Sequence, residues 1–221
     1  MKNNIQKQIP IDSKRKKMAK NINLLNTIVS FTKKPQYFAV GIVDIVNSTN
    51  ITANLPLSDS GFYYSIFLNS IADIVKKSGG NVIKNIGDSL LFSFQEYQNS
   101  SDSKKLIKML ECGMGMIDAH NAINERLLYF DLPEINYRVS ADYGCVLVAD
   151  TKLSSSKDLF GSPVNTCSKI NHKALPNTMV IGCNLHEQVK SNKKFHFEKI
   201  NSCIILGNTK YGIYEVERRI N

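Results

Sequence analysis

The segment GGNVIKNIGDSLLFSF, residues 79–94, contains two strand-like runs separated by a short turn. The runs cover 81–86 and 89–95; Lys84 lies in the first of them, and Asp88 follows the glycine of the turn. A solvated β-hairpin explains the polar residues of this turn without any chemistry. The segment therefore predicts a hairpin, and the rest of the chain decides whether Lys84 and Asp88 have a function.

The segments on both sides of the hairpin predict one α+β domain. QYFAVGIVDIV at 36–46 is rich in β-branched and aromatic residues, as a buried strand is. The further elements expected are a helix start in NSTNIT (47–52), which Ser48 or Thr49 can cap, a loop at 54–61, a helix over 62–80, a long helix over 102–128, and a strand hairpin over 136–150 that turns near Tyr143 and Gly144. The order β-α-β-β-α-β predicts a ferredoxin-like core, with helices packed on one face of an antiparallel sheet. Two short helices and two or three strands are expected to extend it after residue 158.

The composition is that of a soluble globular protein. The chain has 221 residues, of which 43% are hydrophobic and 21% charged. No apolar run approaches the roughly 18 residues that a membrane-spanning helix needs, and no signal peptide is recognised. The five cysteines form no CxxC pair, which favours core packing in a reducing compartment over metal binding. We therefore expect a cytoplasmic protein.

The positive charge is concentrated at the N-terminus. Residues 1–34 hold nine of the 28 Lys and Arg residues and one of the 19 acidic residues. Between Arg15 and Phe31 apolar residues recur every three to four positions, which predicts an amphipathic helix. This helix either packs on the body or on a second copy, or binds an anionic membrane surface, a partner or nucleic acid. We expect a basic arm over 1–34 and a folded domain over 35–221, and of the possible partners of the arm we expect no nucleic acid.

Asp44 and Asp88 are candidate metal ligands. Asp44 lies near the end of the first strand and Asp88 in the hairpin turn, and these points are neighbours in a β-α-β-β-α-β sheet. Adjacent carboxylates are unfavourable unless cations neutralise them, and Mg²⁺ prefers one or two carboxylates together with substrate phosphates. The alternative is a helix-capping aspartate and a turn aspartate, each of which is common.

Four segments resemble, in their order, the catalytic domain of class III nucleotidyl cyclases. They are FAVGIVDIVNST, GGNVIKNIGDSLLFSF, YRVSADYG and DLFGSPVNTCSKI, and the resemblance covers roughly residues 36–217. It implies that Asp44 and Asp88 hold two Mg²⁺ or Mn²⁺ ions per active site, assisted by the backbone carbonyl of Ile45. The resemblance therefore favours the metal interpretation of the two aspartates.

The resemblance also implies a phosphate site. The residues that match the family's phosphate-binding turn are Asn47, Ser48 and Thr49. This turn leads into a helix start, where backbone amides favour anions. Arg138 matches an arginine that contacts the triphosphate. Ser140 departs from the family pattern because it replaces a glycine of the same motif.

Lys84 and Asp158 match the two positions at which the family reads the base. Lysine donates to adenine N1 and aspartate accepts from the adenine amino group, so the pair implies ATP. A structural salt bridge is the alternative for two opposite charges. Asn165 matches a residue that orients the ribose, and Lys169 stands where the family has an arginine that stabilises charge in the transition state.

Two departures concern the phosphates. Lys169 keeps the charge of the family arginine but loses its planar fork. Leu206 replaces a phosphate-contacting lysine, for which Lys210 is a candidate replacement. Both changes put the catalytic rate in question more than the fold.

The resemblance implies an adenylate cyclase that converts ATP to 3′,5′-cyclic AMP and pyrophosphate. It further implies a homodimer in which each of two active sites takes residues from both subunits. Two alternatives stay open. One is a cyclase for GTP or a pyrimidine triphosphate, and the other is a catalytically weak module that binds nucleotide or dimerises.

Overall fold

The computed structural model describes residues 29–32, 34–96, 104–151, 157–206 and 209–219. Its elements, in chain order, are β1 (Val29–Phe31), β2 (Gln36–Ile45), α2 (Ser48–Thr52), α3 (Leu57–Lys77), β3 (Asn81–Ile86), β4 (Ser89–Glu96), α4 (Lys104–Asp118), α5 (His120–Tyr129), β5 (Tyr137–Thr151), β6 (Lys157–Phe160), α6 (Ser162–Asn171), β7 (Met179–Gly182), α7 (Cys183–Val189), β8 (Phe195–Leu206) and β9 (Thr209–Arg218). Among these residues no helix is both long and apolar enough to cross a membrane.

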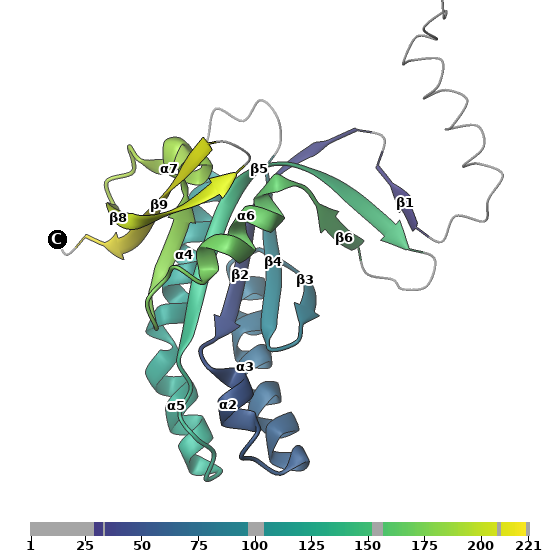
Figure 1. Ribbon diagram of the computed structural model, residues 1–221, viewed down its shortest axis with the longest axis vertical. Helices are drawn as coiled ribbons and strands as arrows, with labels where there is room; N and C mark the ends of the chain where they lie inside the picture. The colour runs from purple at the N-terminus through teal and green to yellow at the C-terminus, as the bar shows by residue number, and fades with distance from the viewer. Residues whose placement is uncertain (1–28, 33, 97–103, 152–156, 207–208, 220–221) are drawn as a thin grey trace, which may run out of the picture.

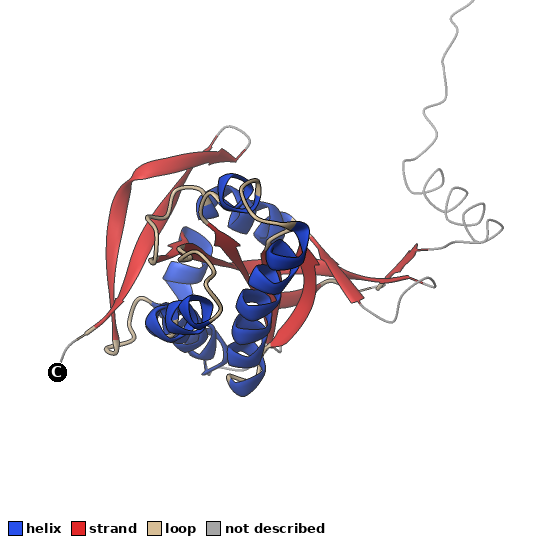
Figure 2. Ribbon diagram, turned by 90° about the horizontal axis from the view of Figure 1, so that it is seen from below, coloured by secondary structure: helices blue, strands red, loops and turns tan. Residues whose placement is uncertain are grey.

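The core has the predicted ferredoxin-like order. Four strands lie side by side as β3-β4-β2-β5, and all three neighbouring pairs are antiparallel. Helices α3 and α4 connect the strands and pack behind the sheet in the view of Figure 1. The sheet continues through β7, which is parallel to β5, to the β9-β8 hairpin, whose strands curve away from the helices (Figure 2).

Each face of the sheet carries its own apolar cluster. Along β2, Ala39 and Val43 belong to the cluster under α3 and α4, whereas Phe38, Val40 and Ile42 belong to the cluster on the other face. The alternation follows from the two-residue repeat of a strand. We call the face with Phe38 the second face. The core helices α3 and α4 share one face, as predicted. Helix α6, one of the two short helices expected after residue 158, packs on the second face, in front of β2 and β5 in Figure 1.

The predicted hairpin over 136–150 is wrong, because these residues form most of the single strand β5. Gly144 is not at a turn: a Cβ there would lie only 2.9 Å from Cγ of Pro163 in α6, so glycine allows the helix to approach the strand. The second half of β5 pairs with β1 and β6 to form a small arm beside the main sheet (Figure 1).

Helix boundaries also differ from the prediction. Helix α3 begins at Leu57, inside the expected loop, and the long helix is divided between α4 and α5 at Ala119. Residues 29–31 of the predicted amphipathic helix form strand β1, where Phe31 packs edge-on against Phe160 with ring centroids 5.2 Å apart. The rest of that prediction, residues 15–28, lies outside the described residues.

A buried carboxyl group links β5 to the C-terminal strands. Asp142 accepts hydrogen bonds from the Tyr211 hydroxyl at 3.0 and 2.9 Å and from the Leu185 amide at 3.4 Å. Burial raises the pKa of Asp142 from 3.8 to about 6, while these hydrogen bonds oppose the shift. The folded chain therefore holds this proton more tightly than the unfolded chain does.

This pKa predicts a specific dependence of stability on pH. The stabilisation from protonated Asp142 is fully present below about pH 4 and is lost as the pH rises through about 6. Asparagine mimics the protonated form. The unfolding free energy of Asp142→Asn relative to wild type should therefore rise by about 2 kcal/mol between pH 4 and pH 7. Urea unfolding at both pH values measures this, with the exposed Asp73→Asn as control. Parallel profiles for wild type and Asp142→Asn would contradict it.

Candidate active site

Asp44 lies at the end of β2 among groups that neutralise its charge. Its Oδ1 accepts a hydrogen bond of 2.5 Å from the Ser89 hydroxyl, and its Oδ2 lies 3.4 Å from Nη2 of Arg138. Strand register produces this contact, because Asp44 is the partner of Arg138 on β5. Both side chains are less than one-fifth exposed, at 16% and 18%. The predicted metal ligand and the predicted triphosphate arginine are therefore in direct contact.

Asp88 occupies the β3-β4 turn at the same edge of the sheet. Gly87 has φ 63°, a value that glycine adopts without strain, and the turn places Asp88 directly before Ser89, which bonds to Asp44. Carboxylate oxygens at one edge suit a hard divalent cation. Among the described residues no three His, Cys, Asp or Glu side chains gather as a metal site. The two aspartates therefore fit ions such as Mg²⁺, which take their other ligands from water and phosphate.

The predicted phosphate turn leads into the short helix α2. Asn47, with φ 57°, is the N-cap residue, and no side chain caps the helix, so the capping expected from Ser48 or Thr49 is absent there. The first amides of any helix have no carbonyl partner within the helix, and this leaves them available to an anion. The side chain of Ile45 is buried, so only its backbone is available to a ligand.

Lys84 and Asp158, 74 positions apart in the sequence, form an ion pair. Nζ of Lys84 lies 2.5 Å from Oδ2 of Asp158, and the side chains are 43% and 29% exposed. The pair joins β3 to β6. The structure thus forms the salt bridge that was the alternative interpretation, and it leaves both side chains accessible to a ligand.

Asn165 and Lys169 lie on α6 one turn apart, and both are exposed. Within the described part of the chain, no hydrogen bond or ion pair joins them to Asp44, Lys84 or Asp158. The predicted site residues of one chain therefore fall into three groups that no hydrogen bond or ion pair of the described residues joins. They are the sheet edge with Asp44, Asp88 and Arg138 (the Asp44 edge), the Lys84–Asp158 pair and the outer face of α6. Lys210 is exposed on β9, cross-strand from Ile205, and Leu206 ends β8.

Comparison with known proteins identifies the domain. The family model of the adenylate and guanylate cyclase catalytic domain matches residues 32–218. The chain belongs to this family. The cytidylate cyclase of Escherichia coli is 24% identical over 168 residues, which are 69% of this chain and 35% of that protein, so the chain spans about a third of that relative.

Solved cyclase structures share the fold. The adenylyl cyclase CyaB from P. aeruginosa superimposes with a TM-score of 0.76 at 16% identity, covering 86% of this chain and 97% of that one. The guanylyl cyclase Cya2 has a TM-score of 0.72 at 18% identity, with coverage of 83% and 92%. These relatives are named as cyclases of cytosine, adenine and guanine nucleotides, so membership of the family leaves the substrate of this cyclase domain open.

A buried polar network, which the sequence analysis missed, holds α6 against the cyclase sheet. The Ser140 hydroxyl donates to the Cys167 carbonyl at 3.0 Å, and the Asn171 amide donates to Ser140 Oγ at 3.2 Å and to the carbonyls of Ile42 and Arg138 at 3.3 Å. The network connects the helix of Lys169 to the strand ends near Asp44. The sequence did contain a signal of this network, because Ser140 replaces a glycine of the family motif.

Removing the Ser140 hydroxyl should weaken this cyclase domain. Ser140→Ala deletes one buried donor and leaves the Cys167 carbonyl without it, so the free energy of unfolding should fall by about 1–2 kcal/mol. Urea unfolding measures the change. Ser58→Ala, which removes an exposed hydroxyl that hydrogen-bonds to Asp59, should change it little. Equal stabilities of the two variants would show that the network is not stabilising.

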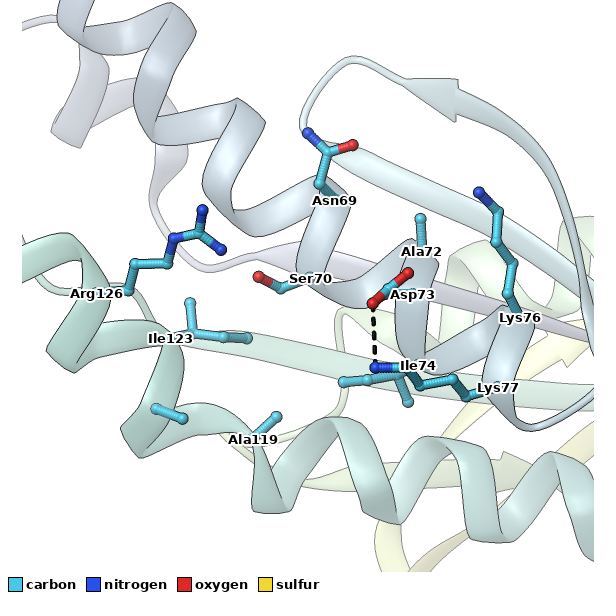
Figure 3. A pocket seen from close by; sticks show the side chains of 11 residues that line it. Asn69, Ser70, Ala72, Asp73, Ile74, Lys76, Lys77, Ala119, Ile123 and Arg126 are labelled. Atoms are coloured by element: carbon cyan, nitrogen blue, oxygen red, sulfur yellow. Dashed lines mark ion pairs between the residues drawn. The ribbon is translucent and has the colours of Figure 1, made fainter.

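A groove of about 460 Å³ also crosses the helical side of the cyclase domain, between α3 and the α4–α5 junction. Figure 3 shows Arg126 on one side of it and the Lys77–Asp73 ion pair, of 3.2 Å, on the other. None of the predicted site residues lines this groove, so it is separate from the candidate active site.

Proposed function

We propose that this domain cyclises a nucleoside triphosphate to the 3′,5′-cyclic nucleotide and pyrophosphate. The observation that carries the proposal is the edge at which Asp44, Asp88 and Arg138 gather beside the phosphate turn. In the reaction the 3′-oxygen forms a bond to the α-phosphorus, the bond to the bridging oxygen of the β-phosphate breaks, and the hydroxyl proton passes to solvent. Catalysis then requires positioning and charge neutralisation.

The residues of this chain have separate roles in the proposal. Asp44 and Asp88 would hold two Mg²⁺ or Mn²⁺ ions, which supply Lewis-acid neutralisation of the phosphates. Arg138, which pairs with Asp44 in the structure, would bind the triphosphate. Asn165 orients the ribose. Lys169 places its positive charge near the transferring phosphate, as a point charge without the fork of arginine.

We infer that Lys84 and Asp158 select a base in which an amino group lies beside an unprotonated ring nitrogen, as in adenine and cytosine. Adenine offers a ring-nitrogen acceptor, N1, beside an amino donor, and cytosine offers the same pair in N3 and its amino group. Guanine and uracil reverse the pattern, with a ring N–H beside a carbonyl. ATP is the first candidate, and CTP is the second because the Escherichia coli relative is named a cytidylate cyclase.

We further propose a homodimer with two shared active sites. Cyclase domains of this family act as dimers on nucleotides. Support comes from the lack of any hydrogen bond or ion pair that joins the three groups among the described residues. A second copy supplies such contacts if the α6 face and the Lys84–Asp158 pair of one subunit meet the Asp44 edge of the other. We assign this catalytic domain to residues 35–221 and a basic arm to residues 1–34.

Product analysis tests the function. Purified protein with Mg²⁺ or Mn²⁺ and each of ATP, GTP, CTP and UTP is analysed by mass spectrometry, beside Asp44→Ala. Cyclic AMP or cyclic CMP that disappears in the variant supports the proposal. A cyclic product from GTP or UTP instead overturns the base assignment, and no product from any nucleotide favours a module that only binds or dimerises.

A further inference from the structure

A pocket of about 410 Å³ lies on the second face of the sheet, away from α3 and α4. Its apolar walls come from several strands: Phe38 of β2, Val82 and Ile83 of β3, Val148 of β5 and Leu159 of β6. A volume of this size is typical of small-molecule sites, in which apolar walls surround a few polar groups. The pocket therefore has the dimensions and walls of a ligand site.

The polar lining comes from positions at which a buried strand normally carries apolar residues. Along β4, Leu91, Ser93 and Gln95 point to the second face, while Phe92 and Phe94 point to the helices. Leu91 belongs to the apolar cluster of the second face, but the next two positions are polar. The change from leucine to serine and glutamine coincides with the pocket.

Ser93 is a buried polar residue of this lining that lacks a hydrogen bond. Its side chain is 0% exposed, and its hydroxyl has no hydrogen-bond partner among the residues that the structure describes. A buried hydroxyl without a partner is unfavourable, so such groups normally bind a water molecule or a ligand. Beside it, Nε2 of Gln95 donates to Oε1 of Gln36 at 2.8 Å. Among the described residues the Gln36 amide nitrogen and the Gln95 oxygen have no other partner, so both are available to another molecule.

We propose that this pocket binds a nucleobase. The Gln36–Gln95 pair and Ser93 offer donors and acceptors side by side, and amide side chains of this kind pair with the edges of planar bases. The apolar walls suit the faces of a ring. Lys157, on the exposed side of the lining, suits the negative charge of an attached phosphate.

Because of the pocket's position, the bound base has two possible sources. Ile83 precedes Lys84, and Lys157 and Leu159 flank Asp158, so the pocket adjoins the base-selecting pair. The base belongs either to the substrate itself, in which case the inference rests on the proposed function, or to a second, free nucleoside or nucleotide. The chemistry of recognition is the same in both cases, and binding experiments separate them.

Nucleoside binding to the full chain tests the proposal without any catalytic step. Adenosine and cytidine are titrated into wild type, Ser93→Val, Gln95→Leu and the control Ser70→Val by calorimetry or ligand-observed NMR. Ser70 lies on α3, outside this pocket. Wild type and Ser70→Val should bind one of the nucleosides equally, and both pocket variants should bind it at least about 10-fold more weakly. Circular dichroism verifies that each variant is folded.

Equal binding by all four proteins, or no binding by wild type at millimolar nucleoside, would overturn the proposal. Lys84→Ala then distinguishes the sources: weakened binding assigns the pocket to the substrate base, and unchanged binding assigns it to a separate ligand. A wild-type protein that binds nucleoside through Ser93 but forms no cyclic product contradicts the proposed function and leaves this inference standing. If the protein forms a cyclic nucleotide and neither its KM nor its nucleoside affinity changes in Ser93→Val and Gln95→Leu, the proposed function stands and this inference is wrong.

Discussion

Asp44→Asn and Asp88→Asn should each reduce the formation of cyclic nucleotide by roughly 1,000-fold or more. Each substitution removes one carboxylate from the edge at which the metal ions are proposed to bind, and bound ions supply several kcal/mol of transition-state stabilisation. The loss should appear mainly in kcat at saturating metal, measured by quantifying the cyclic product over time.

The two variants differ in a way that controls for structural damage. Asp44 is paired with Arg138, so its substitution leaves a largely buried arginine without its partner, whereas within the described ranges Asp88 forms no ion pair. If both variants lose activity and the Asp88 variant is as stable as wild type, the loss therefore indicates that the aspartates act in catalysis and not only in folding. The control is Asp73→Asn on α3, which should stay fully active. Near-normal activity of Asp88→Asn would contradict the metal assignment.

The double variant Lys84→Glu, Asp158→Cys should move the nucleotide preference toward GTP. Glutamate accepts from the N1–H of guanine, and the lost aspartate no longer favours an amino group at the neighbouring position. The ratio of kcat/KM for GTP to that for the preferred amino-base nucleotide should rise about 100-fold, because unpaired polar groups on either side penalise the wrong base.

Competition kinetics with all four nucleotides measure this ratio. Lys76→Glu, the same substitution as at Lys84 but on an exposed position of α3, should leave it unchanged. An unchanged preference in the double variant would mean that the base is selected by other residues, of which the Ser93 pocket is the nearest candidate.

Local patterns were sufficient for the core of the fold. The β-branched run of β2 and the Gly-Asp turn between β3 and β4 depend on neighbouring residues alone, and both predictions are confirmed. The turn predicted near Gly144 is wrong, because glycine occurs both at turns and where two backbones approach closely. Only the position of Pro163 shows which of the two applies here.

The candidate site was less accessible to sequence reasoning. Asp44 and Asp88 could be placed at one edge from strand order, but Lys84 and Asp158 were connected only by the family resemblance. Their contact arises because β6 pairs with the far half of β5 and reaches β3, a long-range arrangement that no periodicity encodes. Ser93 was missed because a single polar residue in a buried strand has meaning only once its missing hydrogen-bond partner is known.

Mixing two inactive variants tests the shared active site most directly. Asp44→Ala lacks the metal edge and Lys84→Ala lacks the base pair, so each homodimer should be inactive. If each site uses the Asp44 edge of one subunit and the base pair of the other, a mixed dimer has one intact site. An equal mixture, with subunit exchange verified by native mass spectrometry, should recover about a quarter of wild-type activity. Exchange without any recovery of cyclic nucleotide would contradict the shared active site.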